Sequence, residues 1–189
     1  MAVKTFAVGE VLTASDTNTY LANAGLVYVT STTFSASSTV TVSNCFTSGS
    51  YAYRIIVSTT TSAAGQLQLV LRSSTTNKTS GYYWSGLYNG SGGSALTGEA
   101  ESNVASWKIG YSEATAATES SIFLDIYYPA HASYKQFTSS NLRQSSSASN
   151  YNTRGGGAPD TSTYDGFQFS SAGGGTLTGK LAVYSYRNA

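Results

Sequence analysis

Alternation of apolar and polar residues with a period of two dominates the chain from residue 26 onward. In the segment Gln66–Arg72, for example, Leu67, Leu69 and Leu71 alternate with polar or β-branched neighbours. Successive side chains of a β-strand point to opposite faces, so this pattern is typical of strands that bury one face. Long helical segments with a period of 3.6 are not found in this part of the chain. The sequence therefore predicts an all-β fold.

About ten segments carry this pattern, and clusters of glycine, serine and asparagine separate nearly all of them. The predicted strands are 26–30, 39–43, 51–57, 66–72, 82–88, 104–111, 120–128, 133–139, 164–169 and 176–187. Many short strands without intervening helices favour an antiparallel sandwich of two sheets. This number of strands favours a jelly-roll-like sandwich, and the Cys…Trp…Cys signature of immunoglobulin domains is absent. One β-sandwich domain is predicted over residues 26–189.

Three segments are predicted to be exposed loops, namely 59–65, 89–98 and 139–160. The third is long for a compact domain. Such length indicates a functional loop, a contact with a partner or an unrecognised strand.

Charged residues make up only 10% of the 189 residues, and the formal net charge is +1. Lysines and arginines are scattered along the chain, so no basic patch is predicted. Nucleic acid and anionic membrane surfaces are therefore excluded as expected partners. With 40% hydrophobic and 13% aromatic residues, the chain has ample material for a core.

Cys45 is the only cysteine, which excludes an intrachain disulfide and a thiolate metal cluster. This count is consistent with assembly in a reducing cytoplasm. No stretch approaches 18 apolar residues, so insertion into a membrane is not expected. A signal peptide is also not expected, because Glu10 interrupts the first apolar run and Lys4 provides only a weak basic region.

The first 25 residues differ from the rest of the chain. Residues 1–12 are predicted to form an extended arm, and residues 13–24 a short helix with Thr13 as its N-cap and Gly25 as its stop. The apolar stripe of this helix is narrow. Such a short helix is not stable alone, so it requires a partner surface.

Residues 6–21 have the form F-x-x-G-E-V-L-T-A-x-D-x-N-x-Y-L. This peptide resembles the virion-attachment start of tailed-bacteriophage structural proteins, of the tail-fibre-like and head-decoration-like kinds. The final segment, Val183–Asn188, resembles the end of such proteins loosely. Between these segments only the composition is similar, with predicted strands that are rich in Ser, Thr, Gly and Tyr.

The resemblance implies a structural part of a virion, assembled in the bacterial cytoplasm, that is not an enzyme. It implies a homotrimer that contacts other virion proteins of the tail or capsid. A short tail-fibre-like protein is the first expectation, and a head-fibre or capsid decoration protein is the second. Because phage fibre heads often bind host glycans, adhesion to a host surface is also implied. The side chains expected to attach the chain to the particle are those of Phe6, Val11, Leu12, Tyr20 and Leu21.

Residues with catalytic chemistry are few. His131 is the only histidine and no G-x-S-x-G motif accompanies it, so a loop histidine is the favoured interpretation. Two carboxylate pairs, Asp160 with Asp165 and Glu99 with Glu101, could hold a calcium ion at a subunit interface, although solvated carboxylates are the favoured interpretation. We therefore predict no catalytic residue, no metal and no cofactor.

Two glycine triplets, Gly155–Gly157 and Gly173–Gly175, lack the strand, helix and lysine context of a phosphate-binding loop. They are predicted to be turns, or places where two backbones approach closely.

Aromatic residues gather in the predicted strand 82–88. Alternation places Tyr82, Trp84 and Tyr88 on one face of this strand and Tyr83 on the other. The first three are possible residues for contact with a glycan or a neighbouring subunit. Core packing or subunit contact is the favoured interpretation, and glycan binding is the alternative. A carbohydrate-binding module or receptor-binding tip is therefore the alternative function.

Overall fold

The computed structural model describes residues 8–11, 13, 25–89, 96–112, 114, 119–144 and 149–186. In these residues the chain forms thirteen β-strands and no helix. The strands are β1 (Leu26–Ser37), β2 (Thr39–Val42), β3 (Ala52–Thr61), β4 (Gly65–Ser73), β5 (Thr76–Asn77), β6 (Tyr82–Asn89), β7 (Leu96–Val104), β8 (Trp107–Ser112), β9 (Ser120–Tyr127), β10 (Lys135–Gln144), β11 (Ser149–Ala158), β12 (Gly166–Ser171) and β13 (Leu177–Tyr186).

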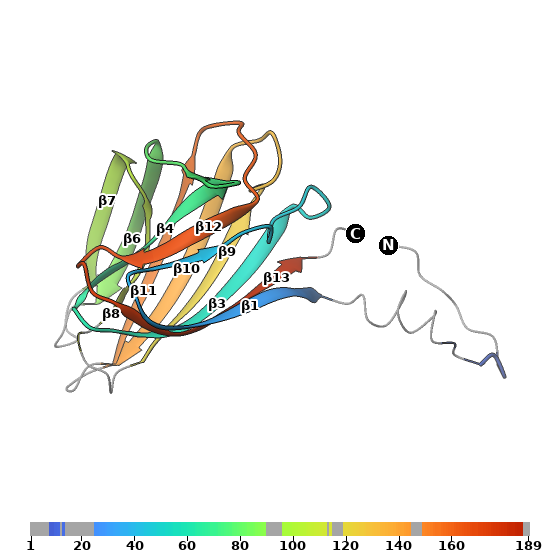
Figure 1. The fold of residues 1–189 in the computed structure, drawn as a ribbon, viewed down its shortest axis with the longest axis horizontal. Coiled ribbons are helices and arrows are strands. Elements are labelled where there is room, and N and C mark those ends of the chain that lie inside the picture. Colours follow the sequence, from blue (N-terminus) through green and yellow to red (C-terminus); the bar gives the residue numbers. More distant parts are fainter. Residues whose placement is uncertain are drawn as a thin grey trace.

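The strands form two antiparallel sheets that face each other as a sandwich (Figure 1). The large sheet has eight strands in the order β1-β13-β3-β9-β10-β11-β6-β7. The small sheet has five strands, with β2, β12 and β4 side by side and both β5 and β8 paired with β4. The predicted two-sheet all-β architecture is confirmed.

The core lies between the sheets and is built by the predicted alternation. Leu67, Leu69 and Leu71 of β4 are buried, whereas Gln66 and Gln68 are half-buried on the other side of the strand. Burial of one such leucine contributes about 2 kcal/mol. The alternation in the sequence therefore predicted correctly which face of β4 is buried.

Aromatic rings join the two sheets. Trp107 of the small sheet packs on Phe137 of the large sheet, with 4.8 Å between ring centroids. Phe34 of β1 and Phe169 of β12 meet edge to face at 6.4 Å. All four side chains are buried, so this layer fixes how the sheets are stacked.

The segment predicted to be a long loop, 139–160, contains the second half of β10 and the whole of β11. The alternative of an unrecognised strand was therefore the correct one. β11 has no apolar alternation, because its inward positions before the glycines are Asn150, Asn152 and Arg154. A hydrophobic pattern cannot reveal such a strand.

Other boundaries also differ from the prediction. The predicted strand 104–111 corresponds to β8, which begins only at Trp107, whereas Val104 is the last residue of β7 in the other sheet. The predicted loop 59–65 is reduced to a tight turn, because β3 extends to Thr61 and β4 begins at Gly65. None of the described residues forms a helix that could cross a membrane.

The predicted helix 13–24 lies outside the described residues, apart from Thr13. Phe6, Leu12, Tyr20 and Leu21 lie outside them as well. Val11 is described and is 78% exposed, and residues 8–11 are drawn apart from the sandwich (Figure 1).

Candidate functional site

A groove of about 530 Å³ crosses the outer face of the large sheet. Its aromatic walls are Tyr83 from β6, Tyr127 from the end of β9, and Tyr134 from the loop before β10. The Gly155–Gly157 triplet of β11 lies between these rings. Tyr134 is 63% exposed and Tyr83 is 41% exposed, so both rings are accessible from solution.

The strand register explains the shape of the groove. Gly157 pairs with Tyr83 on one side and with Gln136 on the other, and Gln136 pairs with Tyr127. Two tyrosines thus stand in one row with a glycine and a glutamine between them. Since neighbouring strands are about 4.8 Å apart, the backbones that carry Tyr83 and Tyr127 are separated by about 14 Å.

The floor of the groove is held from below by the core. The indole N–H of Trp107 donates a hydrogen bond to the carbonyl oxygen of Gly157 at 3.1 Å. Phe137, whose side chain points inward from β10, packs on the same indole. The glycine segment is therefore fastened to the core although it has no side chains of its own.

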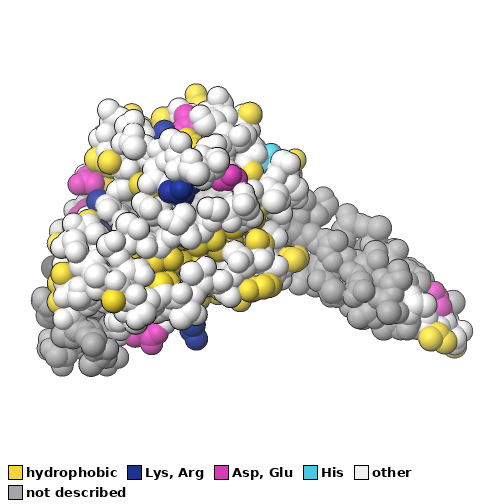
Figure 2. Space-filling view, viewed as in Figure 1, with side chains coloured by type: hydrophobic (Ala, Val, Ile, Leu, Met, Phe, Trp, Pro, Cys, Tyr) yellow, Lys and Arg dark blue, Asp and Glu magenta, His cyan; other side chains and the backbone are white. Residues whose placement is uncertain are grey.

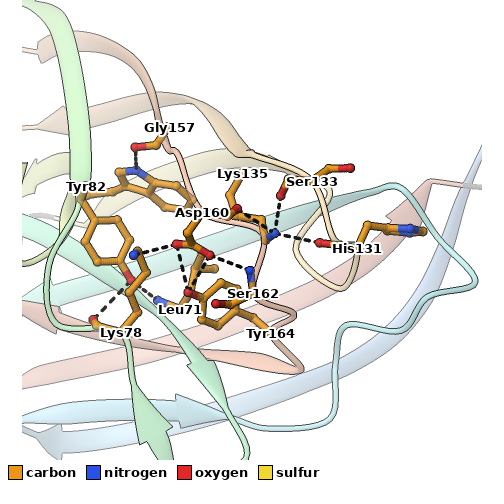
Figure 3. Close-up of polar contacts among 11 residues, drawn as sticks. Leu71, Lys78, Tyr82, His131, Ser133, Lys135, Gly157, Asp160, Ser162 and Tyr164 are labelled. Atoms are coloured by element: carbon orange, nitrogen blue, oxygen red, sulfur yellow. Dashed lines mark hydrogen bonds and ion pairs between the residues drawn. The ribbon is translucent and has the colours of Figure 1, made fainter.

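A buried lysine, Lys135, is among the residues that line the groove (Figure 3). The ammonium group of Lys135 donates hydrogen bonds to the carbonyl oxygens of His131 at 2.8 Å, Asp160 at 3.4 Å and Ser133. Lys135 is 1% exposed, and this burial lowers the pKa of its ammonium group. The lysine fastens the segment before β10 to the segment after β11.

Beside it lies an ion pair between Lys78 and Asp160, with 2.6 Å between Nζ and Oδ2 (Figure 3). The carboxylate also accepts bonds from the Tyr164 hydroxyl and the Ser162 N–H. Burial acts to raise the pKa of Asp160, but the hydrogen bond and charge of Lys78 outweigh it and the pKa is lowered.

The carboxylates considered for calcium have protein partners in the structure. Asp160 is engaged as above, and Asp165 accepts the backbone N–H of Ser74. Glu99 binds Arg154, with 2.9 Å between Oε2 and Nη2, and Glu101 accepts the indole N–H of Trp84 at 2.9 Å. Within the described part of the chain, no group of three or more His, Cys, Asp or Glu residues is placed to hold a metal ion.

Arg154 is the centre of a polar cluster that sequence reasoning missed. Its guanidinium lies over the rings of Trp84 and Tyr111, at 4.7 Å and 4.8 Å from their centroids. Burial lowers the pKa of Arg154, while the charge of Glu99 opposes this change. A buried arginine carries no signal in the sequence, because arginine at a strand position ordinarily indicates an exposed face.

The three residues considered for contact with a glycan or a subunit, Tyr82, Trp84 and Tyr88, are buried or half-buried. Tyr82 is 0% exposed and Trp84 is 4% exposed, so both belong to the core, and Tyr88 is half-buried against Tyr111. The Tyr82 hydroxyl accepts the backbone N–H of Leu71 at 2.7 Å.

The opposite face of β6 points outward and carries Tyr83. The burial of Tyr82 and Trp84 agrees with core packing and places neither side chain where a glycan could reach it. Both faces of this strand carry large apolar residues, so alternation alone could not select the buried one.

His131 stacks on Tyr51, with ring centroids 4.5 Å apart, and its Nε2 lies 3.1 Å from the carbonyl oxygen of Ser50. Its loop position agrees with the favoured interpretation of a structural loop histidine. No family model, curated protein or solved structure matches this chain.

Proposed function

We propose that this chain is a non-enzymatic structural component of a tailed-phage virion. Its N-terminal segment attaches it to the particle, and its β-sandwich is displayed at the surface. A short tail-fibre-like protein is the first form of the proposal, and a head-fibre or capsid decoration protein is the second. In both forms the partners are other virion proteins and two further copies of the chain in a trimer.

The observation that carries this proposal is the exposure of the N-terminal apolar residues. Val8 is 109% exposed and Val11 is 78% exposed, and both belong to the peptide that resembles phage attachment sequences. Their burial in a particle, together with that of Phe6, Leu12, Tyr20 and Leu21, would contribute several kcal/mol at about 25 cal/mol per Å². Symmetric attachment of several copies strengthens this further.

We also infer that the sandwich is a jelly-roll with insertions. The supporting observation is the strand order. β1-β13-β3-β9 in the large sheet faces β2-β12-β4-β8 in the small sheet, which is the pairing expected of eight jelly-roll strands wound as two Greek keys. In this assignment β5, β6 and β7 form one insertion, and β10 and β11 form another. The groove lies largely on these inserted strands.

The test uses C-terminally tagged protein located on intact virions by gold labelling and electron microscopy. We expect label at the tail in the first form of the proposal and label over the head in the second. Deletion of residues 1–24 should abolish labelling, while a tagged Lys180→Met protein, altered on the sandwich only, should label normally. Label on no particle would contradict the proposal.

The second candidate function is a carbohydrate-binding module or receptor-binding tip, which the exposed aromatic groove favours. A module of this kind does not need the N-terminal segment. Deletion of residues 1–24 should then leave binding unchanged, so the same variant separates the two candidates. Turnover of host polysaccharide by the purified protein would contradict both and indicate an enzyme.

A further inference from the structure

We propose that the groove formed by Tyr83, Tyr127, Tyr134 and Gly155–Gly157 binds an uncharged oligosaccharide. This inference deepens the adhesive part of the proposed function and rests on it for its biological role. Its structural argument comes from the rings, the glycines and the charges of the groove.

The rings provide apolar faces with polar margins. Tyr83 and Tyr127 stand in one row across β6, β11, β10 and β9, and Tyr134 is the most exposed of the three. Gln136 and Thr138 are exposed between them and offer an amide and a hydroxyl. Aromatic faces stack on the apolar faces of pyranose rings, while amides and hydroxyls suit the equatorial hydroxyl groups of a sugar.

The glycines of the floor have two different explanations. A Cβ atom on Gly156 would lie 2.1 Å from the carbonyl oxygen of Tyr83, and one on Gly157 would lie 2.8 Å from that of Lys135. Packing therefore requires glycine at these two positions. A Cβ atom on Gly155 would lie 3.4 Å from the carbonyl oxygen of Phe137, which is an ordinary contact. Glycine at position 155 keeps the groove open where packing does not demand it.

The electrostatics of the groove favour a neutral ligand. Lys135 contributes to its wall, but its ammonium group is buried and bound by three carbonyl oxygens. The nearby Asp125 is neutralised by Arg54 through two hydrogen bonds of 2.9 Å and 2.6 Å. Among the described residues that line the groove, acidic glycans, phosphorylated ligands and nucleic acid would therefore find no accessible cation to pair with.

The position of the groove disfavours an extended peptide. Peptides that bind to sheets usually add a strand to an unpaired edge. Along the groove β11 is paired on both sides, with β10 and with β6. Recognition must therefore occur face-on, through rings and side chains, as sugars are recognised.

The groove also stays accessible when the chain is attached by its N-terminal segment. That segment joins the sandwich at β1, and β13 and β3 lie between β1 and β9, the nearest strand of the groove. Attachment and sugar binding thus use different parts of the large sheet.

The experiment screens the purified full-length protein on a printed array of oligosaccharides. The array carries neutral chains of glucose, galactose, mannose and N-acetylhexosamines beside chains containing uronic or sialic acid. The strongest neutral binder is then titrated calorimetrically. We expect Tyr83→Ala and Tyr134→Ala to weaken its binding about tenfold each, and Gly155→Leu, which fills the groove, to abolish it.

Tyr151→Ala is the matched control, because Tyr151 is 52% exposed on the large sheet and does not line the groove. It should bind like the unchanged protein. Thermal unfolding of each variant verifies folding, and Tyr134→Ala remains informative if Gly155→Leu fails to fold, since Tyr134 is largely exposed.

The inference would be overturned if the protein bound no saccharide, preferred acidic chains or bound only peptides. It would also be overturned if Tyr83→Ala, Tyr134→Ala and Gly155→Leu all bound the saccharide as the unchanged protein does. Its failure is distinguishable from failure of the proposed function. If the protein is found on virions but binds no sugar, only the sugar-binding inference is refuted. If the protein binds sugar but is found on no virion, only the virion role is refuted.

Discussion

Several charged residues of this protein are held by other protein groups. Arg54 binds Asp125 with two hydrogen bonds, and the guanidinium of Arg154 lies over the rings of Trp84 and Tyr111. Lys135 is surrounded by backbone carbonyl oxygens (Figure 3). Figure 2 shows few charged side chains on the visible face, among many uncharged ones. These three cations therefore act within the fold.

At the residue scale, Asp160→Asn should destabilise the protein by about 2 kcal/mol at pH 7, because it removes the charge that binds Lys78. The folded-state pKa of Asp160 is lowered. Its contribution is therefore present above the unfolded pKa of about 3.9 and is lost as the pH falls through the folded value. Urea unfolding at pH 7 and at pH 3 measures this difference.

The difference in the free energy of unfolding between the unchanged protein and Asp160→Asn should be smaller at pH 3 than at pH 7. A gap that is equal at both pH values would show that the Asp160 charge does not contribute to stability.

At the scale of elements, β11 is the strand that most departs from the ordinary pattern. Its inward side chains include Asn152 and Arg154, and its second half is the glycine triplet. Isolated, such a strand has low β propensity. It is held by β10 and β6 on its two sides and by the hydrogen bond from Trp107 beneath.

Gly156→Ala should therefore destabilise the protein by about 2 kcal/mol or more, because its Cβ atom would meet the Tyr83 carbonyl oxygen and force β11 away from β6. Gly155→Ala, one residue earlier, should be neutral or stabilise by up to about 1 kcal/mol. Thermal or urea unfolding of the pair is the measurement. Equal destabilisation by both substitutions would contradict the close approach at Gly156.

At the scale of the whole molecule, one core joins the two sheets and should unfold cooperatively. Cys45 is 1% exposed within this core, and burial raises the pKa of its thiol to about 12. The thiolate is the reactive species, so the thiol is protected by both burial and protonation.

We expect a disulfide reagent such as dithionitrobenzoate to leave native Cys45 unmodified at pH 8, and to react at the rate of global unfolding when urea is added. The absorbance of the released thiolate gives this rate. Rapid and complete modification without urea would instead indicate local opening around Cys45.

Much of the architecture was predictable because it depends on local periodicity. The alternation of Leu67, Leu69 and Leu71 predicted both the strand and its buried face. The all-β class followed from the same pattern repeated along the chain. Of the candidate site, the sequence indicated the aromatic segment 82–88 and the glycine triplet at 155, but not their relation to each other.

The sequence by itself therefore determined the secondary-structure class, the two-sheet arrangement and the scarcity of surface charge. Only the tertiary structure decided which face of β6 is buried, that β11 is a strand, and that Tyr83, Tyr127 and Gly157 share one row. The physical reason is that alternation fixes the period of a strand but not its phase when both faces are apolar. Pairing between strands far apart in the chain selects the phase and thereby creates the groove.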